Sequence, residues 1–155
     1  MNKENTCCFT GHRQLPKDKM QQILNKSEAE IIAQIKKGKT SFITGGAVGF
    51  DMLCAEIIIQ LKKQYPINLI IAVPCQNQEK SFSPTDKIRY TKVLSMADEV
   101  VYVSQKYFSG CMYKRNRYMV DNSSCLISYC SKMSGGSYYT KSYAYDNGIE
   151  IIEIS

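Results

Sequence analysis

Short apolar runs alternate with longer amphipathic stretches along the whole chain. The run at 68–73 is apolar from its second residue onward, which is typical of a strand covered on both faces. Each of the other runs is also short enough to be one strand of a sheet. We therefore predict six strands, at 6–10, 41–44, 68–73, 99–103, 126–129 and 149–154.

The stretches between these runs carry apolar residues at the spacing of helices. The first such stretch begins near Met20, and Gly38 lies where a glycine commonly ends a helix. Pro84 marks the start of the third helix, and Gly136 and Gly148 bound the last one. One face of the second helix is predicted to carry Leu53, Ile57 and Leu61, and the inner face of the third Tyr90, Val93, Leu94 and Ala97. The fourth helix carries Met112, Asn116, Met119 and Val120.

Strands that alternate with helices through short connections predict a parallel sheet with helices on both faces. The expected fold is a single Rossmann-like, three-layer α/β domain over residues 1–155, with a mostly parallel six-stranded sheet. In such sheets, ligands bind at the carboxyl ends of the strands, near the point where the strand order reverses.

Composition narrows the possible functions only slightly. The 155 residues are 44% apolar and 22% charged, and the longest apolar run spans 69–73, so we expect a cytoplasmic, soluble protein with no membrane segment. The seven cysteines are scattered without a C-x-x-C pair and the chain has one histidine, which predicts free core thiols and no metal site. A net charge of +6 permits an anionic partner without requiring one.

Glycine and polar residues gather at three of the predicted strand ends. Glycine allows the backbone to approach a ligand closely, and the N-terminus of the next helix favours an anion such as phosphate. A tight turn, a first-turn acid or a loop histidine would explain each cluster alone, but all three share one sheet edge. The clusters are Thr10, Gly11, His12 and Arg13; Gly45, Gly46, Gly49 and Asp51; and Gly135, Gly136 and Thr140.

A fourth candidate lies near the start of the fourth helix, where Arg115 and Asn116 could face the same edge of the sheet. A solvated basic helix face is the equally weighted alternative. Few residues of the chain suggest catalysis. Asp51 and Glu79 are the acids near strand ends that could act as a general base. Any dyad that needs a histidine would have to use His12.

The ordered motifs Cys8–Arg13, Gly45-Gly46-Ala47-x-Gly49-x-Asp51 and Tyr113-x-Arg115-Asn116, with Gly135-Gly136, resemble the YpsA-like branch of the SLOG superfamily. The resemblance spans nearly the whole chain. It implies a Rossmann-like fold with a pocket for nucleotides or nucleotide-derived ligands. Related proteins include LOG-type phosphoribohydrolases and the DNA-processing protein A group, which binds single strands.

The chain departs from the phosphoribohydrolase motif. Aligned on Gly135-Gly136, it has Tyr138 in place of the third glycine and Ser142 in place of the catalytic glutamate. The branch also usually has a tryptophan after the third strand, where Phe82 could stand in. Without the glutamate, the resemblance favours a binding domain over an enzyme.

Together, these observations predict a nucleotide-binding or sensing domain that requires no cofactor and takes a nucleotide or an NAD- or ADP-ribose-type ligand. Backbone N–H groups of the glycines would bind phosphate, Arg13 and Arg115 would neutralise charge, and His12, Asp51 and Asn116 would hold ribose or base. A nucleotide N-glycosidase and a single-stranded nucleic-acid binder are the alternatives. The relatives also imply a homodimer. Four tyrosines could help form its interface, or could equally pack in the core and at its rim: Tyr138, Tyr139, Tyr143 and Tyr145.

Overall fold

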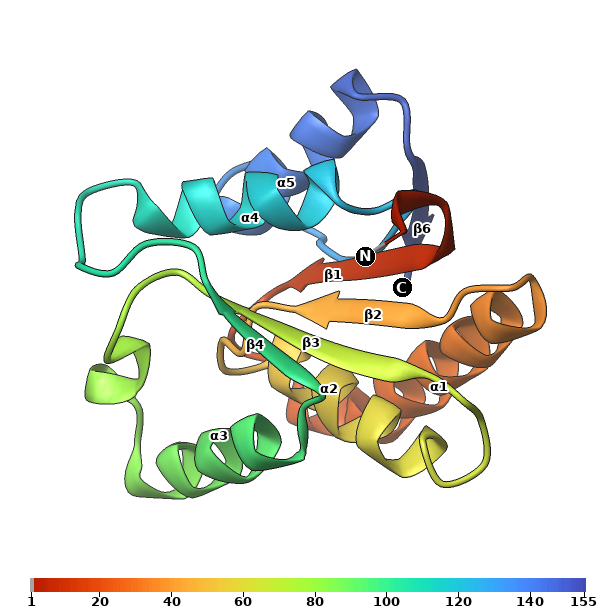
Figure 1. Cartoon of the computed structure of the whole chain (residues 1–155), viewed down its shortest axis with the longest axis horizontal. Coiled ribbons are helices and arrows are strands. Elements are labelled where there is room, and N and C mark those ends of the chain that lie inside the picture. The colour runs from red at the N-terminus through yellow and green to blue at the C-terminus, as the bar shows by residue number, and fades with distance from the viewer. Residues whose placement is uncertain (1) are drawn as a thin grey trace.

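A six-stranded sheet forms the centre of the computed structural model, which describes residues 2–155 (Figure 1). The strand order is β4-β3-β2-β1-β5-β6, and all five neighbouring pairs are parallel. This confirms the Rossmann-like α/β fold, with a sheet that is parallel throughout. The strands are β1 (Thr6–Gly11), β2 (Ser41–Thr44), β3 (Asn68–Val73), β4 (Glu99–Tyr102), β5 (Cys125–Tyr129) and β6 (Glu150–Glu153).

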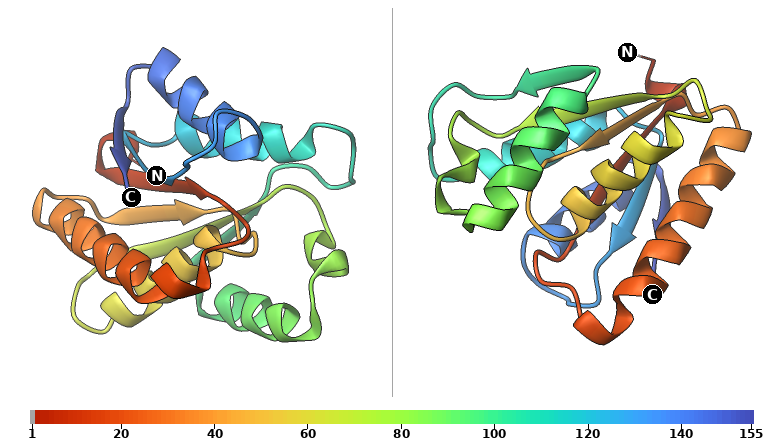
Figure 2. Two further views of the ribbon diagram at one scale, coloured as in Figure 1. Left: turned by 180° about the vertical axis from the view of Figure 1, so that it is seen from behind. Right: turned by 90° about the horizontal axis from the view of Figure 1, so that it is seen from below.

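Five α-helices cover the two faces of the sheet. One face carries α1 (Met20–Lys36), α2 (Phe50–Leu61) and α3 (Pro84–Met96), and the other carries α4 (Cys111–Asp121) and α5 (Gly136–Asp146) (Figures 1 and 2). Three short 3₁₀ helices, η1 (Lys3–Asn5), η2 (Lys17–Lys19) and η3 (Gln78–Ser81), lie in the connections. Among residues 2–155, no helix combines the length and apolar character needed to cross a membrane.

Side-chain alternation along the strands divides the core in two. On β1, Cys7 and Phe9 pack into the larger cluster beneath α1 and α2, whereas Cys8 packs into the smaller one beneath α4 and α5. β1 therefore carries apolar residues at consecutive positions, because helices cover both faces of the sheet. All seven cysteines are free and buried, as expected of thiols that serve as small core residues.

Element boundaries differ slightly from the sequence prediction. The fifth strand begins at Cys125 rather than at Leu126, because Cys125 pairs with Cys7 of β1. The last strand spans Glu150–Glu153, two residues shorter than expected. Gly38 follows α1 with φ = +104°, the left-handed backbone that favours glycine at a helix end.

The strand order reverses at β1. The chain builds outward through β2, β3 and β4, then crosses back over the other face to place β5 beside β1. This gives the sheet a switch point between β1 and β5, where their connections diverge beyond the carboxyl ends of the strands.

Candidate functional site

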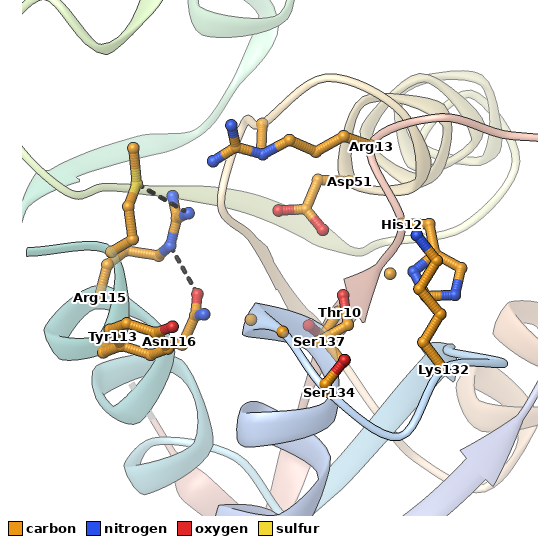
Figure 3. A pocket seen from close by; sticks show the side chains of 15 residues that line it. Thr10, His12, Arg13, Asp51, Tyr113, Arg115, Asn116, Lys132, Ser134 and Ser137 are labelled. Atoms are coloured by element: carbon orange, nitrogen blue, oxygen red, sulfur yellow. Dashed lines mark hydrogen bonds between the residues drawn. The ribbon is translucent and has the colours of Figure 1, made fainter. Parts of the chain in front are cut away.

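A cavity of about 410 Å³ lies at this switch point (Figure 3). Four segments form its walls: the end of β1, the start of α2, the first two turns of α4 and the loop from β5 into α5. The lining residues are Thr10, Gly11, His12, Arg13, Ala47, Asp51, Met112, Tyr113, Arg115, Asn116, Lys132, Ser134, Gly135, Gly136 and Ser137.

The structure brings most of the predicted site residues to this cavity. Those in its lining are Thr10, Gly11, His12, Arg13, Asp51, Arg115, Asn116, Gly135 and Gly136. The other four, Gly45, Gly46, Gly49 and Thr140, lie outside the lining. Their positions indicate that they support the walls.

Gly45 lies directly behind the two buried charges of the site. A Cβ atom at this position would come within 2.6 Å of the Arg115 guanidinium carbon and 2.7 Å of Asp51 Oδ2. The absence of a side chain therefore allows the guanidinium and the carboxylate to converge. Its carbonyl oxygen also accepts a 2.6 Å hydrogen bond from Arg115 Nη1.

The remaining three residues act locally. Gly49 abuts the backbone carbonyls of His12 and Arg13, each 2.4 Å from the position of its absent Cβ. Gly46 packs against Tyr90 on the far side of β2 from the cavity's α4 wall, and the Thr140 hydroxyl donates to the Gly136 carbonyl at 2.9 Å. In this structure, these three residues therefore serve packing and turn geometry.

Arg115 is 3% exposed, so it does not belong to a solvated basic helix face. Its Nη1 donates to the carbonyls of Gly45 and Ala72, and its Nε donates to Asn116 Oδ1 at 2.9 Å. The first two bonds connect α4 to the ends of β2 and β3. Burial lowers the pKa of Arg115, while the charge of Asp51 raises it.

Asp51 lies at the start of α2 and is 6% exposed. Burial raises the pKa of Asp51 to about 6, against the opposing effects of Arg115, the backbone N–H groups of Gly45 and Ala47, and Arg13. A carboxyl group that titrates near neutrality within a cavity is a feature of functional sites.

This raised pKa predicts how stability depends on pH. The folded state keeps a proton that the unfolded chain releases above its pKa of 3.8, so the free energy of unfolding should fall as pH rises from about 4 to about 6. The loss should be about 3 kcal/mol, and Asp51→Asn should abolish it. Urea denaturation of both proteins between pH 4 and pH 7 measures this, and parallel profiles would contradict the assignment.

His12 has a defined hydrogen-bonding state. Its Nε2 accepts the backbone N–H of Ser131 at 2.9 Å, so the neutral ring carries its proton on Nδ1. Burial, followed by the charge of Lys132, lowers the pKa of His12. The ring is therefore neutral at pH 7 and is a hydrogen-bond donor through Nδ1.

The N-terminus of α5 opens onto the cavity. Gly135 caps this helix with φ = +93°, and no side chain in residues 2–155 accepts a capping hydrogen bond there. The first backbone N–H groups of the helix lack acceptors within the helix itself. No atom lies within 4 Å of a Cβ built on Gly135 or Gly136, so a ligand would have unobstructed access.

Sequence reasoning did not include six lining residues among its site residues. Ser134 and Ser137 flank the glycine pair, which was a usable signal, whereas nothing in the local pattern distinguished Lys132. The others are Ala47, Met112 and Tyr113. Glu79, proposed above as a general base, lines a different cavity between α3 and β4.

The arrangement of charges is asymmetric. Arg13, Arg115 and Lys132 surround the cavity from different segments, and Figure 3 shows them around the space that Asp51 also faces. Asp51 is the single acidic side chain of this lining in the described part of the chain. Nowhere in residues 2–155 do three histidine, cysteine, aspartate or glutamate side chains gather as they would around a metal ion.

Two solved structures share this fold. DNA processing protein A from Streptococcus pneumoniae superposes with a TM-score of 0.70 at 16% identity, over 97% of this chain and 50% of the other. The Helicobacter pylori protein of the same name, described as having a unique single-stranded DNA binding mode, gives 0.67 at 18% identity, over 97% and 65%.

Sequence relatives give a closer relationship. The uncharacterised prophage-derived protein YoqJ of Bacillus subtilis is 36% identical over 122 residues, covering 70% of this chain and 71% of YoqJ. A UPF0398 protein of Halalkalibacterium halodurans is 30% identical over 103 residues, covering 64% of this chain and only 54% of its own length. Residues 7–150 match the model of the YspA SLOG family. The chain belongs to the YspA SLOG family.

Proposed function

We propose that the protein binds a nucleotide or nucleotide-derived ligand, with its phosphate in the switch-point cavity. The observation that carries the proposal is the convergence of Arg13, Arg115, Lys132 and the uncapped N-terminus of α5 on one cavity. Helix N-termini bind phosphate through their free N–H groups. A volume of about 410 Å³ lies within the range of small-molecule sites.

The residues divide between two parts of such a ligand. The backbone N–H groups after Gly135, with the hydroxyls of Ser134 and Ser137, would hold phosphate oxygens, and Arg13 and Lys132 would neutralise their charge. Across the cavity, Asn116 and Tyr113 would contact ribose or base. The Tyr113 ring packs edge-on against the Tyr139 ring, with 4.6 Å between the ring centroids. This packing holds Tyr113 in place for such a contact.

Arg13 provides the test, because it is exposed and its replacement should leave the fold intact. We expect a thermal-shift screen of nucleotides to give a ligand, and Arg13→Gln to weaken its binding about 10- to 100-fold in titration calorimetry. Lys92→Gln, an exposed lysine on α3, is the matched control and should bind like the wild type. Unchanged affinity in Arg13→Gln would refute the proposed phosphate contact.

Asp51 supports a second candidate, a nucleotide N-glycosidase. A buried carboxyl group with a pKa of about 6 is suited to general acid–base catalysis near neutral pH. In that case product should accumulate from a bound nucleotide, and Asp51→Asn should abolish product while binding persists. Binding without product over prolonged incubation favours the sensing function.

The structural likeness to the H. pylori protein, described as binding single-stranded DNA, favours testing nucleic acid as well. Affinity for a single strand should fall steeply with salt, because phosphate contacts release counterions. A ligand held in the cavity by one or two phosphates should respond only mildly to salt.

The homodimer is likewise a proposal here. Tyr138 and Tyr145 are exposed on α5, whereas Tyr139 and Tyr143 stack against each other.

A further inference from the structure

A second cavity adjoins the switch-point cavity. Its volume is about 790 Å³, and its walls come from residues 75–78, 80 and 81, which follow β3, and residues 105–107, which follow β4. Because these strands are parallel to β1, both loops lie beyond the same edge of the sheet, on the left in Figure 1. Met112 lines both cavities, so its side chain lies where the two meet.

One backbone group behind both cavities is hydrogen-bonded to a lining residue of each. The carbonyl oxygen of Gly45 accepts Arg115 Nη1 from the first cavity at 2.6 Å and Gln78 Nε2 from the second at 3.1 Å. Arg115 Nη2 in turn lies 3.7 Å from the Met112 sulfur. Arg115 therefore contacts both Gly45, which also binds Gln78 of the second cavity, and Met112, which lines both cavities.

Side-chain amides and a phenol ring dominate the chemistry of the second cavity. Gln76 and Gln105 join its two walls, through a backbone hydrogen bond of 3.2 Å and a side-chain hydrogen bond of 3.1 Å. Amide groups carry a donor and an acceptor side by side, which suits the edge of a nucleobase. Tyr107 is 75% exposed at the rim, where its ring is available for stacking on a base.

Two lysines add positive charge at the same rim. Lys80 and Lys106 both line the second cavity and are exposed, and no ion pair involving either occurs in residues 2–155. Base-reading amides, a stacking ring and free ammonium groups together match one nucleotide unit. The second cavity thus repeats, with different residues, the recognition chemistry of the first.

We propose that the ligand is a dinucleotide, two nucleoside units joined through phosphate, that spans both cavities across Met112. One unit places its phosphate at the N-terminus of α5, and the base of the other stacks on Tyr107 between the amide walls. Met112, an unbranched and flexible side chain, adapts to the bridging phosphate. The proposal rests on the proposed function, because the first unit uses the phosphate site described there.

Titration calorimetry with three adenine ligands tests it: AMP, 5′-phosphorylated diadenylate, which has a phosphodiester link, and NAD⁺, which has a pyrophosphate link. At least one dinucleotide should bind roughly tenfold or more tightly than AMP, because one more base stacks. The double variant Lys106→Ala/Tyr107→Ala should reduce its affinity to that of AMP and leave AMP binding unchanged. Lys87→Ala/Ile88→Ala, which removes an exposed lysine and an exposed large apolar side chain on α3, is the control and should behave as the wild type.

The outcomes separate the two proposals. If AMP binds through Arg13 but neither dinucleotide binds more tightly, or if the double variant loses nothing, the dinucleotide assignment is wrong and the proposed function stands. If none of the three ligands binds, the dinucleotide assignment is wrong, and the thermal-shift screen of other nucleotides decides the proposed function. An eight-residue oligonucleotide that binds more tightly still, with a steep salt dependence, would overturn the dinucleotide in favour of a continuous single strand. Preference for diadenylate or for NAD⁺ identifies the linkage.

Discussion

Replacing Arg115 with methionine is expected to lower the free energy of unfolding by about 3–5 kcal/mol, because a buried charged group and its hydrogen bonds to two backbone carbonyl groups are lost. Methionine keeps an unbranched apolar stem and removes the guanidinium group with its charge. The Ala72 carbonyl loses its hydrogen bond to Arg115 Nη1, and the Asp51 carboxyl loses its main cationic neighbour. For a chain of this length the melting temperature should fall by roughly 10 °C.

Urea denaturation at pH 7 measures the loss, and Lys92→Met, an exposed substitution, should change stability by less than about 0.5 kcal/mol. The double variant Asp51→Asn/Arg115→Met should be more stable than Arg115→Met alone, because no unpaired carboxylate stays buried. A single variant within 1 kcal/mol of the wild type would show that Arg115 is not structurally required.

Gly49→Ala should be at least as damaging, with a loss of about 4 kcal/mol or more. The backbone at Gly49 has φ = +85° and ψ = −128°, a conformation that costs a residue with a side chain about 1–3 kcal/mol. The added Cβ would also meet the carbonyl oxygens of His12 and Arg13 at 2.4 Å. Backbone atoms cannot rotate away, so the end of β1 would have to move.

Gly38→Ala separates the two causes. Gly38 has φ = +104°, but nothing lies within 4 Å of a Cβ built on it, so only the backbone strain is present. We expect a loss of about 1–2 kcal/mol there. Equal losses in the two variants, measured by chemical denaturation, would contradict the close approach at Gly49. Since the Phe50 N–H donates to the His12 carbonyl at 3.1 Å, Gly49→Ala should also distort the cavity.

The sheet edge that holds the site was predictable from residues alone. In a parallel sheet all the carboxyl ends fall on one edge, so the segment from Thr10 to Arg13 and the Gly135-Gly136 pair had to lie near each other once the strands were placed. Apolar residues at consecutive positions, as at Cys7 and Cys8 of β1, are typical of a strand covered on both faces, and these two side chains do occupy opposite clusters.

The roles of the other glycines could not be read from the chain. Gly45 and Gly135 look alike in sequence, since each follows a strand and precedes a helix. One proves to make room for Arg115, which reaches it from a segment 70 positions away, and the other faces open space. The path of α4 across the sheet determines which glycine contacts Arg115. No short sequence pattern encodes a contact between residues so far apart in the chain.

The second cavity escaped prediction for a related reason. Its walls come from two loops whose residues, such as Gln76 and Lys106, form no motif in either segment. They become a site because the Gln76–Gln105 hydrogen bonds join the loops after β3 and β4. Loop pairing of this kind depends on the lengths of both connections and on the η3 turn.

The buried cysteines can report local opening of the folded protein. Burial raises the pKa of Cys8 to about 12 and that of Cys54 well above its ordinary value, so neither forms a reactive thiolate while the fold is closed. Cys54 lies on α2 and packs in the larger core cluster, and Cys8 lies on β1 and packs in the smaller cluster beneath α4 and α5. Alkylation of each thiol therefore records when its own side of the sheet opens, without any label being engineered into the chain.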